Sequence, residues 1–318
     1  MPDEPSVAIV GAGIMGNGLA THFTLEGCDV TLIDHRQSNL DEAGARILDA
    51  VEFLRDAAGV DATPDDVLDA IELTLDQDAG VADADIVLES VSEDLEIKHE
   101  LFEAVAAAAP EDAVLASNTS SIQISNIAEA VPDAADRVVG CHWWNPPYLM
   151  PLVEVVRGAD TSDETVERVV SFVESVDRNP IVVERDVPGF VWNRIQFAVL
   201  REAMHIVDEG IASIEDVDAA VRDGYALRTA VVGPFETVDL SGLDLFQSIS
   251  NDLYPHLSTV DEASELFDEY IDAGRNGVED GAGFYEYDRS PDAVLAERDR
   301  TILALREARG ESVGANDD

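Results

Sequence analysis

Short apolar runs alternate with longer amphipathic stretches over the first 186 residues. The run SVAIV at 6–10 leads into GAGIMG, a helical pattern follows from about Met15 to Glu26, and DVTLID at 29–34 resembles a second buried strand. Further strands are expected at 71–75, 86–91, 113–116, 138–142, 152–156 and 181–183. Helical patterns occur near 39–58, 64–70, 95–109, 123–131 and 163–176. Strands that alternate with helices predict a parallel, doubly wound sheet.

The pattern changes after Asp186. From Phe190 onward the apolar spacing is helical, as in VWNRIQFAVLREAMHIVDEG and SIEDVDAAVRDGYA, and no strand is expected. We therefore predict an α/β domain over residues 1–186 and an all-α domain over 187–318. Long apolar helices commonly dimerise, so a homodimer through the second domain is expected. The last residues, from about 308, are expected to form a frayed tail.

Composition indicates the class of protein. The N-terminus MPDEPSVAIVGAG has no basic region and is not expected to be a signal peptide. No apolar run approaches the roughly 18 residues of a membrane span. The two cysteines, Cys28 and Cys141, are too few for a disulfide framework or a multi-cysteine metal site. A reduced, cytoplasmic protein without a metal is the expectation.

The charge balance is strongly acidic. The chain has 67 acidic and 19 basic residues, which gives a net charge of −48, and its only lysine is Lys98. At molar salt the Debye length falls to about 3 Å, which largely screens the resulting self-repulsion. The composition therefore resembles that of cytosolic proteins from extreme halophiles. Because no basic face is expected, neither nucleic acid nor a membrane surface is an expected partner.

A glycine motif follows the first strand. In GAGIMG, Gly11 permits a tight turn, Gly13 lets the backbone approach a pyrophosphate, and Gly16 lets the helix pack on the strand. Asp34, at the end of the second strand, would accept a hydrogen bond from a ribose 2′-hydroxyl and repel a 2′-phosphate. This arrangement predicts a Rossmann-type domain that binds NAD. The candidate cofactor contacts are Gly11, Gly13, Ile14, Met15, Gly16 and Asp34.

The sequence SNTSS at 117–121 follows another expected strand. In an open parallel sheet, loops at the carboxyl ends of strands line the ligand crevice. Such a loop could supply polar side chains beside a nicotinamide. It could equally be an ordinary serine-rich turn, since Ser and Thr are favoured in turns.

Several motifs in order carry a family resemblance. They are GAGIMG, ESVSEDLEIKHELF at 89–102, SNTSS, HxxNPP at 142–147, LVEVV at 152–156, PGFxxNR at 188–194, GPFE at 233–236 and GFYEY at 283–287. Together they closely resemble the L-3-hydroxyacyl-CoA dehydrogenase family over nearly the whole chain. The resemblance implies an NAD-binding domain followed by a helical domain that dimerises.

The same resemblance implies site residues. The family's catalytic histidine corresponds to His142 and its partner acid to Glu154. Hydride transfer from a secondary alcohol needs a base of near-neutral pKa, which histidine supplies, and a carboxylate that fixes its tautomer. Asn193 begins the helical domain, so the site is expected in the interdomain cleft. The implied substrate contacts are Ser120 and Asn193, and the implied cofactor contacts are Glu93, Lys98 and Asn145.

Neighbouring residues receive other expectations. Cys141 is expected to be a small buried residue and no nucleophile, because hydride transfer needs none. Trp143 and Trp144 are expected to form walls of the cleft.

The implied reaction is oxidation of an L-3-hydroxyacyl-CoA to the 3-oxoacyl-CoA, but the sequence departs from the family. Residues 38–59, where typical members carry lysines that meet the CoA phosphates, contain only Arg46 and Arg55 as bases, and Glu279 replaces another family lysine. YLMPLVE and YALRTAVVGPFE resemble the branch of lambda-crystallin and L-gulonate 3-dehydrogenase. A free 3-hydroxy acid, like gulonate or carnitine, is thus the alternative substrate. Arg228 could pair with its carboxylate, or form an interhelical or dimer-interface ion pair.

Overall fold

The chain separates into two compact units. The computed structural model describes residues 4–311. The first unit comprises the residues up to Asn193 together with those from Ala296 onward, and the second unit is Arg194–Leu295. The predicted limits, 1–186 and 187–318, assign the end of the chain to the helical part, whereas by packing the residues from Ala296 onward belong with the sheet. The expected tail lies largely outside the described residues.

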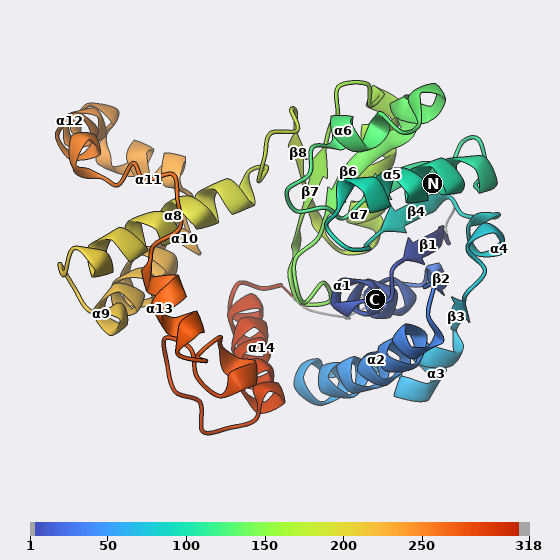
Figure 1. Ribbon diagram of the computed structural model, residues 1–318, viewed down its shortest axis with the longest axis horizontal. Coiled ribbons are helices and arrows are strands. Elements are labelled where there is room, and N and C mark those ends of the chain that lie inside the picture. The colour runs from blue at the N-terminus through green and yellow to red at the C-terminus, as the bar shows by residue number, and fades with distance from the viewer. Residues whose placement is uncertain (1–3, 312–318) are drawn as a thin grey trace. The chain divides into compact units, whose positions relative to one another are not determined.

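An eight-stranded sheet in the order β3-β2-β1-β4-β5-β6-β7-β8 forms the frame of the first unit (Figure 1). All neighbouring strands are parallel except β6 and β7, which are antiparallel. The prediction of a parallel sheet is therefore confirmed apart from this pair. A turn without a crossover helix joins β6 to β7, and only antiparallel neighbours can be joined in that way. The strands are β1 Ser6–Val10, β2 Asp29–Ile33, β3 Ile71–Thr74, β4 Ile86–Glu89, β5 Val114–Ser117, β6 Val138–His142, β7 Leu152–Val156 and β8 Asn179–Val183.

Helices cover both faces of this sheet. Alternate residues of each strand point to opposite faces, so Val7 and Ile9 join one core while Ala8 and Val10 join the other. α1, α2, α3 and α7 supply the first core, and α4, α5 and α6 supply the second. The doubly wound, Rossmann-type prediction is thus confirmed. The elements are α1 Ile14–Leu25, α2 Gln37–Ala58, α3 Pro64–Asp69, α4 Gln77–Val81, α5 Leu95–Ala108, α6 Ile124–Ala128, the 3-10 helix η1 Pro132–Arg137, and α7 Asp163–Ser175.

The second unit is helical, as predicted. Its described residues add only isolated bridges at Gly277, Ala282 and Glu286. Large apolar side chains remain exposed on it, among them Phe235 and Val231. Two helices span the division between the units, α8 Trp192–Asp208 and α14 Pro291–Ala308. The others are α9 Ile214–Ala219, the π-helix η2 Ala220–Ala226, α10 Leu227–Thr229, α11 Pro234–Ser241, α12 Leu243–Leu253, η3 Tyr254–His256, α13 Leu266–Asp272 and η4 Val278–Asp280.

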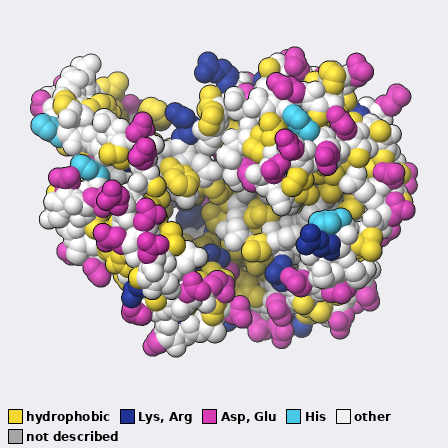
Figure 2. All heavy atoms as spheres, in the orientation of Figure 1, with side chains coloured by type: hydrophobic (Ala, Val, Ile, Leu, Met, Phe, Trp, Pro, Cys, Tyr) yellow, Lys and Arg dark blue, Asp and Glu magenta, His cyan; other side chains and the backbone are white. Residues whose placement is uncertain are grey.

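Acidic side chains are scattered over the visible surface and do not collect in one region (Figure 2). Over residues 4–311, none of the helices has the length and hydropathy needed to cross a bilayer.

Candidate active site

The glycine turn between β1 and α1 has the shape that a dinucleotide needs. Gly11 has φ +110°, and a Cβ there would lie 2.5 Å from the Ser90 carbonyl oxygen. A Cβ on Gly16 would lie 1.8 Å from the Gly11 carbonyl oxygen, so neither position accepts a side chain. No other atom lies within 4 Å of a Cβ built on Gly13, so its backbone is open to an approaching group. α1 begins there with the exposed Ile14 and the partly buried Met15.

Asp34 is fixed beside this turn. Its Oδ2 accepts a hydrogen bond from the Ala12 N–H at 2.9 Å, and its Oδ1 accepts one from Asn39 Nδ2 at 2.9 Å. A pocket of about 350 Å³ adjoins it, lined by Gly11, Asp34, His35 and residues of α4 and α5. A pre-positioned carboxylate at the end of β2, next to a glycine turn, fits the ribose end of NAD.

His142 and Glu154 lie opposite each other on β6 and β7. The imidazole Nδ1 is 2.8 Å from Glu154 Oε2, and both side chains are buried. The other carboxylate oxygen accepts hydrogen bonds from the backbone N–H groups of Val191 at 2.9 Å and Trp192 at 3.0 Å. Burial alone would raise the pKa of Glu154, but the His142 and backbone hydrogen bonds outweigh it and lower that pKa.

Aromatic side chains surround the imidazole. The rings of Trp144 and Phe190 lie 4.4 Å and 5.6 Å from the His142 ring, centroid to centroid. Phe190 is buried with φ +46°, directly after Gly189 with φ +76°. The PGF segment thus turns sharply to bring Phe190 against the histidine before α8 begins.

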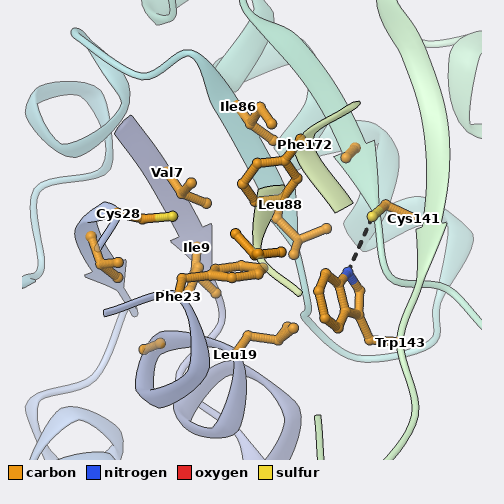
Figure 3. Close-up of a cluster of buried hydrophobic side chains, with 14 of the residues drawn as sticks. Val7, Ile9, Leu19, Phe23, Cys28, Ile86, Leu88, Cys141, Trp143 and Phe172 are labelled. Carbon is orange, nitrogen blue, oxygen red and sulfur yellow. Dashed lines mark hydrogen bonds between the residues drawn. The ribbon is translucent and has the colours of Figure 1, made fainter. Parts of the chain in front are cut away.

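Cys141 and Trp143 point away from the histidine, into the core. Trp143 is 2% exposed, and its indole N–H donates a hydrogen bond to Cys141 Sγ, as Figure 3 shows beside Phe23. The expectation that Trp143 forms a cleft wall is therefore wrong, because side chains alternate along the chain and only Trp144 faces the imidazole. Burial raises the pKa of Cys141 to about 12, which agrees with a packing role.

The SNTSS loop reaches the other side of the imidazole. Ser120 Oγ lies 3.1 Å from His142 Nε2, while the Asn193 side-chain amide donates to the Ser120 carbonyl oxygen at 3.2 Å. The four expected catalytic residues therefore come together within the first unit, in one chain of hydrogen bonds. Those residues are Ser120, His142, Glu154 and Asn193.

Glu93 shapes this loop. Its Oε1 accepts hydrogen bonds from Thr119 Oγ1 at 2.7 Å and from the backbone N–H groups of Ser120 and Ser121 at 3.0 Å. Burial raises the pKa of Glu93, but these hydrogen bonds and the charge of Lys98 outweigh it, so the net shift is downward. A carboxylate that remains ionised therefore orients the turn that carries Ser120.

Lys98 lies beneath this loop and is only 1% exposed. Its Nζ is 2.6 Å from Glu89 Oε1 and 3.3 Å from Glu93 Oε2. Glu89, buried at the end of β4, also accepts a hydrogen bond from Ser117 Oγ at 2.6 Å. No role was assigned to Glu89 or Ser117 from the sequence. A glutamate at the end of the apolar run IVLE could have indicated a buried charged group there. A direct contact between Lys98 and the cofactor stays a prediction.

Two other expected residues are not joined to this hydrogen-bond chain. Asn145 is exposed in the β6–β7 turn and precedes a cis peptide bond to Pro146. Arg228 is exposed on α10 of the second unit. The proposed contacts of both residues stay predictions.

Comparison with known proteins identifies the family. The model of the 3-hydroxyacyl-CoA dehydrogenase NAD-binding domain matches residues 6–187, and that of the C-terminal domain matches 189–287. The chain belongs to the 3-hydroxyacyl-CoA dehydrogenase family. It is an NAD-dependent oxidoreductase with a small-molecule substrate.

Relatives of this dehydrogenase act on different substrates. The chain is 34% identical to the 5-formyl-3-hydroxy-2-methylpyridine 4-carboxylate 5-dehydrogenase of Mesorhizobium japonicum, over 95% of this chain and 97% of the relative. It is 35% identical to the L-carnitine dehydrogenase of Streptomyces coelicolor, over 96% and 94%. With a probable 3-hydroxybutyryl-CoA dehydrogenase of Deinococcus radiodurans it shares 37% identity, over 88% and 99%.

Solved structures show the same fold. A crystal structure of a 5-formyl-3-hydroxy-2-methylpyridine 4-carboxylic acid 5-dehydrogenase superposes with a TM-score of 0.88 at 34% identity, covering 97% of this chain and all of the other. The (S)-3-hydroxybutyryl-CoA dehydrogenase of Ralstonia eutropha gives 0.71 at 31% identity, covering 90% and 100%.

Proposed function

We propose that this dehydrogenase oxidises the 3-hydroxyl group of a small free hydroxy acid, with His142 as the general base. The hydrogen-bonded chain from Ser120 through His142 to Glu154 is the observation that carries this proposal. A histidine held between a hydroxyl and a buried carboxylate is arranged to take a proton from an alcohol.

The chemistry follows from the roles of the two ring nitrogens. Glu154 accepts the Nδ1–H, which leaves a lone pair on Nε2 to take the substrate's hydroxyl proton. The carboxylate then stabilises the imidazolium. Ser120 and Asn193 orient the substrate oxygen, and in the reverse direction they polarise the ketone. When bound, NAD⁺ supplies the acceptor for the hydride that leaves the carbinol carbon.

The cofactor contacts are proposed from the glycine turn and the SNTSS loop. The open backbone at Gly13 and the N–H groups at the start of α1 would hold the pyrophosphate. Asp34 would bind the adenosine ribose and disfavour NADP. Glu93 and Asn145 would contact the nicotinamide half, with Lys98 acting through Glu93.

A free acid is favoured over a CoA thioester for two reasons. CoA is strongly anionic, and α2, the helix where the family's CoA-binding lysines occur, carries five acids and two arginines. One of those arginines, Arg46, already pairs with Glu42 at 3.3 Å. The relatives that match nearly the whole chain also include dehydrogenases named for a pyridine carboxylate and for carnitine. Arg228 is the proposed partner of the substrate carboxylate.

A 3-hydroxyacyl-CoA is the second candidate substrate, which would place the enzyme in fatty acid metabolism. The matching family models carry this name, and the relative from Deinococcus radiodurans at 37% identity has a related one. The two substrates need the same chemistry at His142, so only turnover separates them.

Dimerisation and cellular location are also proposed. Exposed side chains such as Phe235, Val231 and Leu240 on the second unit support a homodimer through that unit. Light scattering should give twice the chain mass at molar KCl, and a monomer would contradict this. The scarcity of cysteines supports a cytoplasmic location.

The test is a substrate panel at molar KCl. NAD⁺ reduction is measured with carnitine, L-gulonate and other free 3-hydroxy acids, beside NADH oxidation with acetoacetyl-CoA. Turnover of a free acid with a kcat/KM well above that for acetoacetyl-CoA is expected. Turnover of acetoacetyl-CoA alone would assign the enzyme to thioesters. No turnover in either arm, with NADH bound tightly, would point to a non-catalytic dinucleotide-binding protein.

A further inference from the structure

The turn of residues 143–151 joins the strands that carry His142 and Glu154. A two-residue hairpin turn fixes the register of its strands by itself, but a turn of this length does not. Because a slip of one residue would turn either side chain to the other face, this register needs support from elsewhere in the fold.

Arg178, just before β8, contacts the turn from one side. It is 4% exposed, and its guanidinium donates hydrogen bonds to the carbonyl oxygens of Pro147 at 3.3 Å and Tyr148 at 3.1 Å. Its Nη2 also lies 3.1 Å from His22 Nδ1. The other ring nitrogen of His22 lies 2.9 Å from the Val176 carbonyl oxygen, where it donates a proton. Burial first, and then the charge of Arg178, lower the pKa of His22 and keep it neutral.

Arg306, on α14, contacts the next residue of the turn. It is 6% exposed, and its Nη1 donates to the Leu149 carbonyl oxygen at 2.9 Å. The Leu149 side chain is fully buried in a small core with Leu54 of α2 and Leu303 of α14. Three consecutive carbonyl groups, at residues 147–149, therefore receive hydrogen bonds from two buried guanidinium groups.

Burying two like charges near each other is costly. Burial, and then the positive charge of Arg306, lower the pKa of Arg178 to about 10, so the group remains charged at neutral pH. The acids near these groups are at least partly exposed. Asp177 Oδ2 is 3.7 Å from Arg178 and Glu311 Oε2 is 3.3 Å from Arg306, and the charge of Glu26 also acts on Arg178. The charges therefore serve mainly the backbone of the turn, and hydrogen bonds from charged donors are the stronger kind.

α1 closes the third side of the turn. A Cβ on Gly18 would lie 2.8 Å from Pro147 Cδ, so the helix approaches the turn as closely as a glycine allows. The same helix begins at the glycine turn proposed for the cofactor. Movement of residues 147–149 would therefore act mainly on the catalytic strands, because α1 is also held in the core by its packing on β1 and α2.

We infer that Arg306 and Arg178 are positioning residues for the catalytic hairpin, and that the C-terminal helix α14 is a working part of the active-site unit. The family model of the C-terminal domain ends at residue 287, before α14 begins. The inference rests on the proposed function, because it assumes that His142 and Glu154 perform the chemistry.

Arg306→Met tests the inference. Methionine fills a similar volume without the charge, and its introduction removes the repulsion between Arg306 and Arg178, so the fold should persist. We expect kcat to fall about 10- to 100-fold, because a small displacement of catalytic groups has an effect of this size. The dissociation constant of NADH, measured by fluorescence, should stay within about twofold of the wild type, and Arg306→Lys should recover part of kcat.

Arg309→Met is the matched control. Arg309 lies one turn further along the chain and also pairs with Glu311, at 2.8 Å, but its side chain is exposed, whereas that of Arg306 is buried. It should retain wild-type kcat. A folded Arg306→Met protein with wild-type kcat would overturn the inference, as would an equal loss in Arg309→Met. If Arg306→Met does not fold, Arg306→Gln decides, because its shorter side chain lacks the charge: wild-type kcat there would overturn the inference as well.

His142→Ala separates this inference from the proposed function. A nearly normal turnover in His142→Ala would contradict the proposed function itself. If His142→Ala is inactive while Arg306→Met is fully active, only the proposed role of α14 is contradicted.

Discussion

His142 and Glu154 are cross-strand neighbours on the only antiparallel pair of the described sheet, with Nδ1 and Oε2 2.8 Å apart. The backbone ladder thus places the imidazole against the carboxylate. The same carboxylate also accepts the N–H groups of Val191 and Trp192. One buried group therefore connects the catalytic hairpin to the beginning of α8.

Replacing His142 by alanine should abolish most turnover and spare cofactor binding. General-base catalysis by a side chain contributes about 10² to 10⁴-fold, so a loss of kcat in this range is expected. The glycine turn and Asp34 do not contact the imidazole, so NADH affinity should change little. Steady-state kinetics and NADH fluorescence titration check this, and a kcat near wild type would contradict the role of His142.

Glu154→Gln should change both activity and acid stability. The folded state lowers the pKa of Glu154, so its contribution to stability is present above the unfolded-state pKa of about 4.3 and disappears as pH falls through the folded-state value. The wild type should therefore lose unfolding free energy on acidification more steeply than Glu154→Gln. At neutral pH the variant should show a loss of kcat of up to about 10⁴-fold, because the histidine tautomer is no longer fixed.

Denaturant midpoints at constant KCl, measured from pH 7 towards pH 3, check the stability part. Glu52→Gln, at an exposed position on α2, is the control and should follow the wild type. Parallel curves for wild type and Glu154→Gln would contradict the prediction.

The sequence predicted the doubly wound sheet because strand and helix periodicities are local. It also identified Ser120, His142, Glu154 and Asn193 through the resemblance, and these residues meet. The contacts it missed are between distant segments: neither Arg306 with the Leu149 carbonyl nor Glu89 with Ser117 has a periodic signal. For Lys98, rarity suggested importance, but only the structure shows that the side chain is buried.

Asp34→Ser should weaken the preference for NAD over NADP. The carboxylate is held in place by Ala12 and Asn39, so its charge would face a 2′-phosphate directly. Removing it should lower kcat/KM for NAD about tenfold, as expected for loss of a hydrogen bond to a charged group, and raise that for NADP. Kinetics with both cofactors check this, and an unchanged ratio of the two kcat/KM values would exclude Asp34 from ribose recognition.

Arg228→Ala tests the proposed carboxylate partner. If this side chain pairs with the substrate, KM for the free acid should rise by about 10- to 100-fold while NADH binding is unchanged. Arg222→Ala, on η2 of the same unit, is the control and should have little effect, because Arg222 already pairs with Asp223 at 3.2 Å. A changed oligomeric state with an unaltered KM would instead assign Arg228 to an interface.

Lys98→Met should reduce kcat through the SNTSS turn. The ammonium lies between Glu89 and Glu93, so its removal leaves Glu89 buried without its cationic partner and Glu93 with only its turn hydrogen bonds. A lost partner in a buried ion pair is strongly destabilising, so the single variant should also have a lower Tm. The double variant Glu89→Gln/Lys98→Met removes the buried charge imbalance and should regain much of that Tm.

The kcat of the double variant separates two roles for Lys98. If Lys98 positions Glu93 and thereby Ser120, kcat should stay about tenfold low even where stability is restored, because the contact between Lys98 and Glu93 is still missing. If the ion pair serves only folding, kcat should recover together with Tm. A large loss of NADH affinity in the double variant would instead indicate that the lysine reaches the cofactor, which would require it to leave the buried position between the two glutamates.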